Sequence, residues 1–205
     1  MEVAICIMAR KPELGRVKTR LAATVGDDFT LAAYQSMLTY TLNEVAGAGT
    51  VFVAYTPEPL DDCSYDQFPQ AEGNLGQRLK HAAQELLAKG YQKLVFMGTD
   101  CVEFTRADVD RAVRHLDSSD FCIGPAHDGG YYLMALKPGG LYVFDEMPWS
   151  TGDLMAATTA AITGRGESYT LLETKSDIDE WSDLSIHIEH LGLQDRVPPS
   201  LNHGR

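Results

Sequence analysis

Apolar runs of strand length alternate with helical patterns along most of this chain. Continuous apolar runs, typical of strands buried on both faces, occur at residues 2–9, 50–55 and 93–101. Apolar residues at helical spacing follow each run, at residues 27–49, 74–90 and 105–116. This alternation predicts an α/β domain with a mostly parallel sheet.

The second half of the chain continues the pattern with shorter elements. Two strands are expected at residues 120–126 and 130–136, and the turn between them is short enough to admit an antiparallel member. A helix is expected from Ser150 or Thr151 towards Ile162, then a strand at 168–173 and a last helix capped by Ser182. We expect one domain over residues 1–195 and a loose tail over 196–205.

Charge is distributed unevenly along the chain. The sequence has 17 Lys and Arg against 29 Asp and Glu, a formal net charge of −12, yet five of the basic residues fall within residues 10–20. The acidic balance argues against a nucleic-acid surface, which needs a broad basic face. A local basic cluster still suits a small anionic ligand, although a solvated charged loop is about as consistent with composition alone.

The remaining composition indicates a cytoplasmic protein without membrane insertion. Cys6, Cys63, Cys101 and Cys122 have neither CxxC nor zinc spacing, and three of them sit in apolar runs expected to be core. The first apolar run is too short for a signal peptide, and no segment reaches membrane-spanning length. The sequence leaves the oligomeric state open.

Polar clusters follow three of the predicted strands. They are the basic loop after the first strand, GTDC after the third and GPAHDGG after the next. In open α/β sheets, ligands bind beyond the carboxyl ends of the strands, so these clusters are expected to converge on one edge.

The basic loop has the residue types that surround a phosphate. Gly15 lets the backbone approach a ligand, while Lys18 and Arg20 supply charge and hydrogen-bond donors. The loop is not a P-loop, because GxxxxGK[ST] is absent.

Asp100 ends a buried strand, where a carboxylate needs a partner or a metal ion. Magnesium commonly takes one or two carboxylates together with water and phosphate oxygens, so Asp100 with Asp177 or Asp179 suits Mg²⁺ or Mn²⁺. From the residues alone, a structural hydrogen-bonding role for Asp100 and a turn-forming role for Asp177 and Asp179 remain alternatives.

Six motifs, in this order, resemble the family called selenodomain-associated transferase 1: MARKPELGRVKTRLA, GNLGQRL, GTDC, GPAHDGGYYLMAL, PWST and DIDEWSDL. The likeness covers residues 1 to about 190. The family is similar to the GT-A nucleotide-diphospho-sugar transferase superfamily, which implies a three-layer α/β sandwich. The chain departs from the family at Val102, where proline is usual, and has Asp100-Cys101-Val102 in place of a strict DxD.

The resemblance also implies roles for individual residues. The phosphates of a nucleotide would be bound by Lys18, Arg20, Arg10, Lys11, Gly15 and Arg78. The metal would be held by Asp100 with Asp177 or Asp179. The acceptor or sugar would lie against Gly129, Gly130, Tyr131 and Trp149, with Asp128 as the base. For Tyr131 and Trp149, plain core packing is equally consistent with the sequence.

Three functions follow from the resemblance. Members are commonly labelled glycosyltransferases, which implies a nucleotide-diphospho-sugar donor, Mg²⁺ and a small-molecule acceptor. The superfamily also holds nucleotidyltransferases, in which a phosphorylated acceptor attacks the α-phosphate of an NTP, and the dense basic loop suits that chemistry. A nucleotide-binding domain without catalysis is the third, in view of Val102 and the missing DxD. We favour glycosyl transfer.

Overall fold

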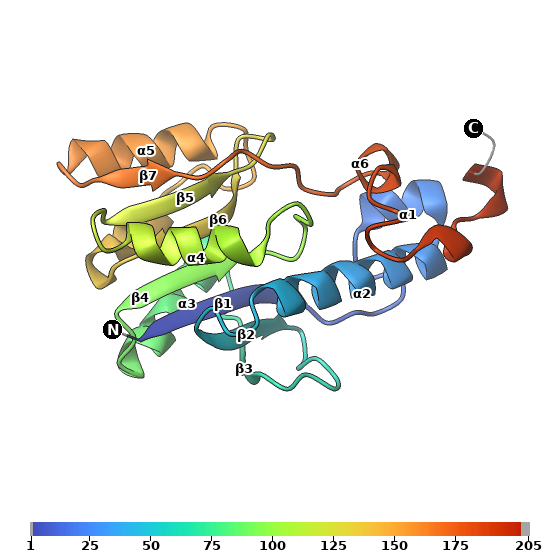
Figure 1. Ribbon diagram of the computed structural model, residues 1–205, viewed down its shortest axis with the longest axis horizontal. Coiled ribbons are helices and arrows are strands. Elements are labelled where there is room, and N and C mark those ends of the chain that lie inside the picture. The colour runs from blue at the N-terminus through green and yellow to red at the C-terminus, as the bar shows by residue number, and fades with distance from the viewer. Residues whose placement is uncertain (1, 202–205) are drawn as a thin grey trace.

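A seven-stranded mixed sheet forms the centre of the protein in the computed structural model, which describes residues 2–201 (Figure 1). The strands lie in the order β3-β2-β1-β4-β6-β5-β7. Their bounds are β1 Val3–Arg10, β2 Thr50–Thr56, β3 Asp66–Pro69, β4 Lys93–Met97, β5 Phe121–Pro125, β6 Tyr131–Leu136 and β7 Tyr169–Leu171.

Most neighbouring strands of this sheet are parallel. β1 pairs in parallel with β2 and β4, β2 with β3, and β5 with β7, whereas β6 runs antiparallel to both β4 and β5. The predicted α/β fold with a mostly parallel mixed sheet is therefore confirmed, and β6 is the antiparallel member that the short turn before it allowed.

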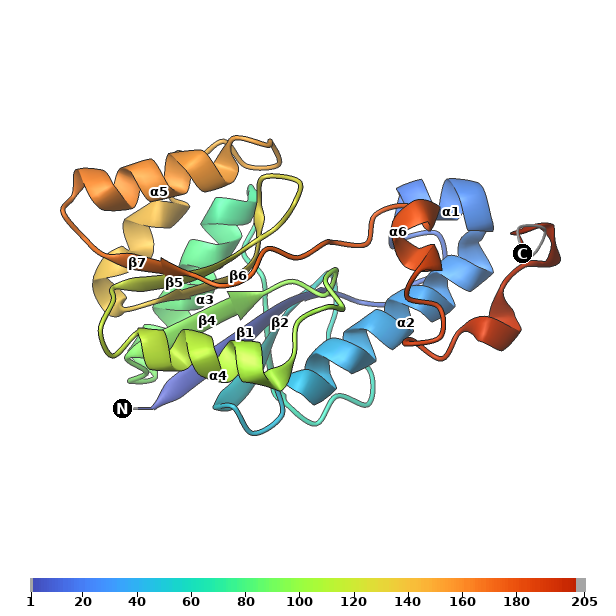
Figure 2. The ribbon, with the colours of Figure 1, turned by 45° about the horizontal axis from the view of Figure 1, so that its top comes forward.

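Helices cover both faces of the sheet (Figures 1 and 2). On one face, β-strand residues such as Ile5 and Val95 pack against Leu38 and Val109 of two helices, α2 and α4. On the other face, the core includes residues of α3, α5 and the 3-10 helix η1. The helices are α1 Thr19–Val25, α2 Asp27–Glu44, α3 Leu75–Ala88, α4 Arg106–His115, α5 Leu154–Gly164, α6 Trp181–Ser185, and the 3-10 turns η1 Pro138–Phe144, η2 Gln194–Arg196 and η3 Pro199–Leu201.

Side-chain caps explain where two of the predicted helices begin. The Asn74 side chain accepts a hydrogen bond from the Gln77 amide at 3.0 Å, and Gln77 Oε1 accepts one from the Asn74 amide at 2.9 Å. At the start of α4, the Asp108 carboxylate accepts from the Thr105 amide at 2.8 Å. Both helices therefore start where the sequence predicts.

Two predicted helix starts are wrong by a few residues. The Thr151 hydroxyl donates to the Pro148 carbonyl at 2.8 Å and so belongs to the preceding turn, and α5 begins only at Leu154. The last helix begins at Trp181 rather than after Ser182, because Asp183 accepts from the Glu180 amide at 2.8 Å and completes the cap there.

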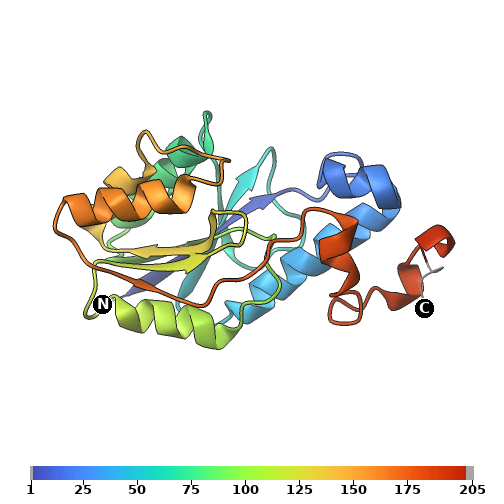
Figure 3. The ribbon, with the colours of Figure 1, turned by 90° about the horizontal axis from the view of Figure 1, so that it is seen from above.

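A lobe projects beyond the carboxyl end of β1 (Figures 2 and 3). It consists of α1, the first part of α2, α6 and the segment after α6, around a third cluster of buried residues that includes Leu21, Met37 and Leu184. Val197 and Leu201 are partly buried against this cluster, and residues 202–205 of the predicted tail lie outside the described residues. The lobe therefore faces the edge of the sheet where ligand binding is expected.

Cys6, Cys101 and Cys122 are buried and free, as the apolar runs around them predict, and Cys63 is half-buried. None of the helices in residues 2–201 has the length and apolar character that crossing a membrane would require.

Candidate functional site

Three segments meet between the sheet and the lobe. The basic loop leaves β1, the turn containing Asp100 leaves β4, and residues 172–180 lead from β7 to α6. The last two are tied by backbone contacts, since Cys101 forms a β-bridge with Asp177 and the Ile178 amide donates to the Asp100 carbonyl at 2.9 Å. The expected convergence named GPAHDGG in place of residues 172–180, and GPAHDGG contacts this segment through the β-bridge between Ala126 and Lys175.

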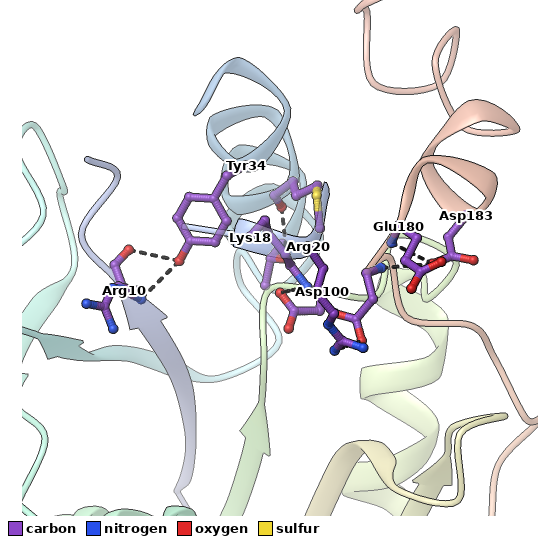
Figure 4. Close-up of polar contacts among 10 residues, drawn as sticks. Arg10, Lys18, Arg20, Tyr34, Asp100, Glu180 and Asp183 are labelled. Carbon is purple, nitrogen blue, oxygen red and sulfur yellow. Dashed lines mark hydrogen bonds and ion pairs between the residues drawn. The ribbon is translucent and has the colours of Figure 1, made fainter. Parts of the chain in front are cut away.

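Lys18 lies between two carboxylates, of which Figure 4 labels Asp100. Its Nζ is 3.0 Å from Asp100 Oδ1 and 3.0 Å from Asp179 Oδ1, and its side chain is only 9% exposed. Burial lowers the pKa of Lys18, but the charges of Asp100 and Asp179 outweigh it and leave the pKa above its ordinary value. Lys18 is therefore a fixed positive charge at this point.

The backbone of Lys18 adopts a conformation that non-glycine residues rarely take. Its φ of 43° and ψ of 52° place it in the left-handed region, directly before α1 begins. This conformation costs about 1–2 kcal/mol in an ordinary residue, and such strain clusters at functional sites. It directs the ammonium group back towards Asp100 instead of outward to solvent (Figure 4).

Arg20 and Asp177 complete the charged cluster. Arg20 Nη2 donates to Asp179 Oδ2 at 2.6 Å, while the rest of its side chain is exposed. Burial raises the pKa of Asp177 to about 7, and the negative charges of Asp100 and Asp128 add to the rise. The pKa of Asp177 thus responds to three other carboxylates and to the Lys18 cation.

The donor chemistry of this cluster fits a hard divalent cation. Within residues 2–201, no three His, Cys, Asp or Glu side chains come together as a ready metal site. Asp100 and Asp179 nevertheless converge on one point, where the Lys18 ammonium lies, and both present oxygen ligands of the kind that Mg²⁺ and Mn²⁺ prefer.

Two adjoining pockets open at this edge. The first, here called the basic pocket, has a volume of about 450 Å³ and includes Arg10, Arg16, Lys18 and Tyr34 in its walls. The second, here called the apolar pocket, has a volume of about 180 Å³ and includes Tyr131 and Asp177. The two pockets share the residues Met8, Leu75, Gly98 and Asp100.

Tyr34 is a pocket residue that sequence reasoning missed. Its hydroxyl accepts from the Arg10 amide at 2.9 Å and donates to the Arg10 carbonyl at 2.8 Å, which fixes the end of β1 (Figure 4). Nothing in the helical pattern of α2 distinguishes this tyrosine from a core residue. Only the crossing of α2 over the strand end reveals its role.

Other predicted phosphate-binding residues have different partners. Lys11 Nζ lies 3.3 Å from both Glu58 and Asp61, in the loop after β2. Arg78 Nε donates to the Gly73 carbonyl at 3.0 Å, so it fixes the turn before α3. Gly15 has a φ of 70°, and this left-handed turn of the backbone accounts for a glycine at this position.

The turn between β5 and β6 contains the predicted base. Asp128 is exposed, and its Oδ1 accepts from the Gly130 amide at 2.8 Å. Gly129 donates to the Ala126 carbonyl and accepts from the Met155 amide at 2.8 Å. The turn is therefore tied to the start of α5, and one Asp128 oxygen takes part in forming it.

Gly129 is expected to be intolerant of a side chain. It has a φ of 88°, and a Cβ there would lie 2.1 Å from the Gly152 carbonyl oxygen. We expect Gly129→Ala to lower the free energy of unfolding by about 2–4 kcal/mol, from left-handed strain and overpacking. Gly166→Ala is the matched control, since Gly166 has a φ of 74° and a Cβ there would meet nothing within 4 Å. If urea unfolding showed an equal loss of unfolding free energy in both variants, the left-handed backbone alone would account for the loss at Gly129.

Tyr131 and Trp149 pack against each other and leave polar atoms unsatisfied. Their ring centroids are 6.3 Å apart in an edge-on arrangement, and Trp149 also contacts Phe144. The Tyr131 hydroxyl and the Trp149 indole nitrogen are buried and have no hydrogen-bond partner in the part of the chain that the structure describes. Tyr131 lines the apolar pocket, whereas Trp149 is not among its lining residues and lies against Gly76.

Comparison with known families places the chain in a group of bacterial proteins. The family model described as "Uncharacterized protein conserved in bacteria (DUF2064)" matches residues 41–151, more than half of the chain. No curated protein sequence matches the chain.

Solved structures share the whole fold. A candidate nucleotide-diphospho-sugar transferase from Desulfovibrio desulfuricans G20 is 28% identical, with a TM-score of 0.85 over 93% of this chain and 88% of the other. CMP:2-keto-3-deoxy-manno-octonic acid synthetase, in complex with CTP, is 12% identical with a TM-score of 0.57 over 96% and 99%. Rv0371C from Mycobacterium tuberculosis H37Rv, in complex with manganese, is 12% identical with a TM-score of 0.55 over 92% and 99%.

These matches support the superfamily that the motifs indicate. At 12% identity the last two show the fold alone, and the structure from Desulfovibrio extends the likeness to the sequence. The narrower resemblance to selenodomain-associated transferase 1 stays a prediction.

Proposed function

We propose that this chain, which belongs to the bacterial DUF2064 family, is a metal-dependent transferase with a nucleotide-diphospho-sugar as donor and a small molecule as acceptor. The observation that carries the proposal is the pairing of Lys18 with Asp100 and Asp179, beside a pocket that Arg10 and Arg16 line. The likeness to the candidate nucleotide-diphospho-sugar transferase from Desulfovibrio desulfuricans G20 supports the same donor.

The basic pocket is where the donor's phosphates would bind. Arg10, Arg16 and Lys18 bring positive charge to its wall in a chain whose net charge is −12. Hydrogen bonds between such groups and phosphate oxygens are charge-assisted, and those to arginine are often bidentate. Arg20 lies outside the pocket walls but holds Asp179, so its role is to position that carboxylate.

Asp100 and Asp179 would hold Mg²⁺ or Mn²⁺, and the manganese complex of Rv0371C supports that choice of cation. When bound, the cation would neutralise charge on the phosphates that leave. Lys18 would then hold phosphate oxygens in place of its carboxylate partners, because it lines the basic pocket. Asp177 lines the apolar pocket and is less suited than Asp179 to share a cation with Asp100.

Nucleotidyl transfer from an NTP is a second candidate. The dense positive charge of the basic pocket favours it, because that reaction depends on positioning and charge neutralisation and needs no base. The likeness in fold to the synthetase that binds CTP is compatible with this chemistry as well.

A thermal-shift screen of nucleotides and nucleotide sugars, with and without Mn²⁺, would identify the donor. Binding to the folded state should raise its stability by about 2.7 kcal/mol at a hundredfold excess over Kd. We expect stabilisation by nucleoside diphosphates or their sugar conjugates, and a larger effect with Mn²⁺. A flat response across the panel would contradict the proposal.

Lys18→Met should weaken binding of the best nucleotide by about 10–150-fold, or about 1.5–3 kcal/mol, as for a lost hydrogen bond to a charged group. The measurement is isothermal titration calorimetry. Lys80→Met is the control, since Lys80 pairs with Asp145 and lines neither pocket. An unchanged Kd in a folded Lys18→Met protein would refute the phosphate role.

A further inference from the structure

The apolar pocket differs sharply from the basic pocket in the character of its walls. It adjoins the charged cluster at Asp100, and most of its lining is aliphatic, aromatic or sulfur-containing. The apolar side chains in its walls are Met8, Leu75, Leu79, Phe96, Met97 and Phe104. Apolar cavities of about 150 Å³ bind molecules the size of benzene, so a volume of about 180 Å³ suits a body slightly larger than that ring.

The apolar pocket contains carboxyl groups but no basic side chain within the described residues. Asp100 and Asp177 line it, and no Lys, Arg or His of residues 2–201 is among its lining residues. Arg10, Arg16 and Lys18 all line the neighbouring basic pocket. Of the two pockets, the basic one therefore offers cationic partners to a phosphate group, whereas the described lining of the apolar one offers none.

Tyr131 supplies a polar group that has no partner. Its buried hydroxyl makes no hydrogen bond within the described residues, and leaving such a group unpaired costs about 1–3 kcal/mol. Burial raises the pKa of Tyr131, so the hydroxyl stays protonated and able to donate. Because Tyr131 lines the pocket, a small shift of its ring would let this hydroxyl donate to a ligand oxygen there. Asp177 could accept a hydrogen bond from the ligand's own hydroxyl.

We propose that the apolar pocket is the acceptor subsite, and that the acceptor is an uncharged hydroxyl compound with a compact apolar body rather than a phosphorylated molecule. This inference rests on the proposed function, because it identifies the acceptor of that reaction. It also separates the two chemistries. An acceptor hydroxyl suits glycosyl transfer, whereas nucleotidyl transfer to a phosphorylated acceptor would need a cationic side chain beside Tyr131 and Asp177, and no Lys, Arg or His of residues 2–201 lines the pocket there.

Phenol and phenyl phosphate make a matched pair of probes, which differ in charge but share the ring. With ¹³C-methyl-methionine labelling, Met97 reports on the apolar pocket alone, whereas Met8 lines both pockets. In the absence of nucleotide, we expect phenol to shift the Met97 methyl resonance at millimolar concentration. Phenyl phosphate at equal concentration should leave Met97 unshifted. No shift with phenol, or equal shifts with both probes, would overturn the inference.

Tyr131→Phe tests the hydroxyl without changing the ring. We expect it to weaken phenol binding by about 2–10-fold, the range for one neutral hydrogen bond, and to leave benzene binding unchanged. Tyr142→Phe is the control, because its hydroxyl pairs with Glu167 and Tyr142 does not line the pocket. Phenol binding unaffected by Tyr131→Phe would overturn the role of the hydroxyl.

The two proposals fail in different ways. The phenol titration contains no nucleotide, and the thermal-shift screen contains no acceptor. Phenol binding with a flat nucleotide screen would refute the nucleotide-using transferase and, with it, the acceptor assignment. Nucleotide binding without a phenol shift at Met97 would overturn only the acceptor subsite.

Discussion

Asp100→Asn should lower kcat by at least about 10²–10³-fold, the cost of losing one preorganised charge-stabilising group at the reacting phosphates. The reason is the position of Asp100, which ends the turn after β4 and shares Lys18 with Asp179 at 3.0 Å from each carboxylate. Asparagine keeps the size of the side chain and removes one anionic ligand. The activity should no longer respond to Mg²⁺ or Mn²⁺ across a titration.

Metal binding itself can be followed apart from turnover, by the paramagnetic relaxation of water protons in the presence of Mn²⁺. Asp100→Asn and Asp179→Asn should both weaken the signal, whereas Asp110→Asn should not, because Asp110 pairs with Arg106 on α4. A wild-type Mn²⁺ titration in Asp100→Asn would show that the metal lies elsewhere. Loss of folding in that variant would instead show that Asp100 is structural.

The meeting of Lys18, Asp100 and Asp179 follows from the order of strands and helices. These residues are far apart in the sequence, but each follows a strand or lies between a strand and a helix. Carboxyl ends of parallel strands share one edge of a sheet, so alternation alone is enough to bring such residues together. The sequence could therefore predict the neighbourhood of the site.

The exact partners within the site could not be predicted in the same way. The sequence suggests a metal ion for Asp100 but gives no sign that the ammonium of Lys18 lies 3.0 Å from it. That contact depends on the left-handed backbone of Lys18, a conformation without a sequence signal in a lysine. The partners of Lys11 were equally unpredictable, because its place in the basic loop gives no sign that it pairs with Glu58 and Asp61.

The edge strand β3 could not be predicted from the sequence, for a different reason. β3, at Asp66–Pro69, lies at the end of the sheet, where its residues are exposed or half-buried. An edge strand of this kind has no continuous apolar run and can contain proline. Its pairing with β2 is determined by the neighbouring strand rather than by its own pattern.

The base of the proposed glycosyl transfer can be tested through Asp128. If Asp128 removes the acceptor's proton, Asp128→Asn should lower kcat by about 10²–10⁴-fold and barely change the affinity for the nucleotide sugar. Asp128 lies in the turn before β6 with one oxygen bound to the Gly130 amide. Its charge also acts on Asp177, which lines the apolar pocket.

Asp177→Asn is the matched variant, because it removes the other carboxylate on the acceptor side. Steady-state kinetics of both variants, with the donor that the screen identifies, separate the possibilities. A kcat loss in Asp177→Asn alone would keep glycosyl transfer and move the base to Asp177. A loss confined to acceptor KM in both variants would favour nucleotidyl transfer, since a phosphorylated nucleophile is already ionised and requires no base.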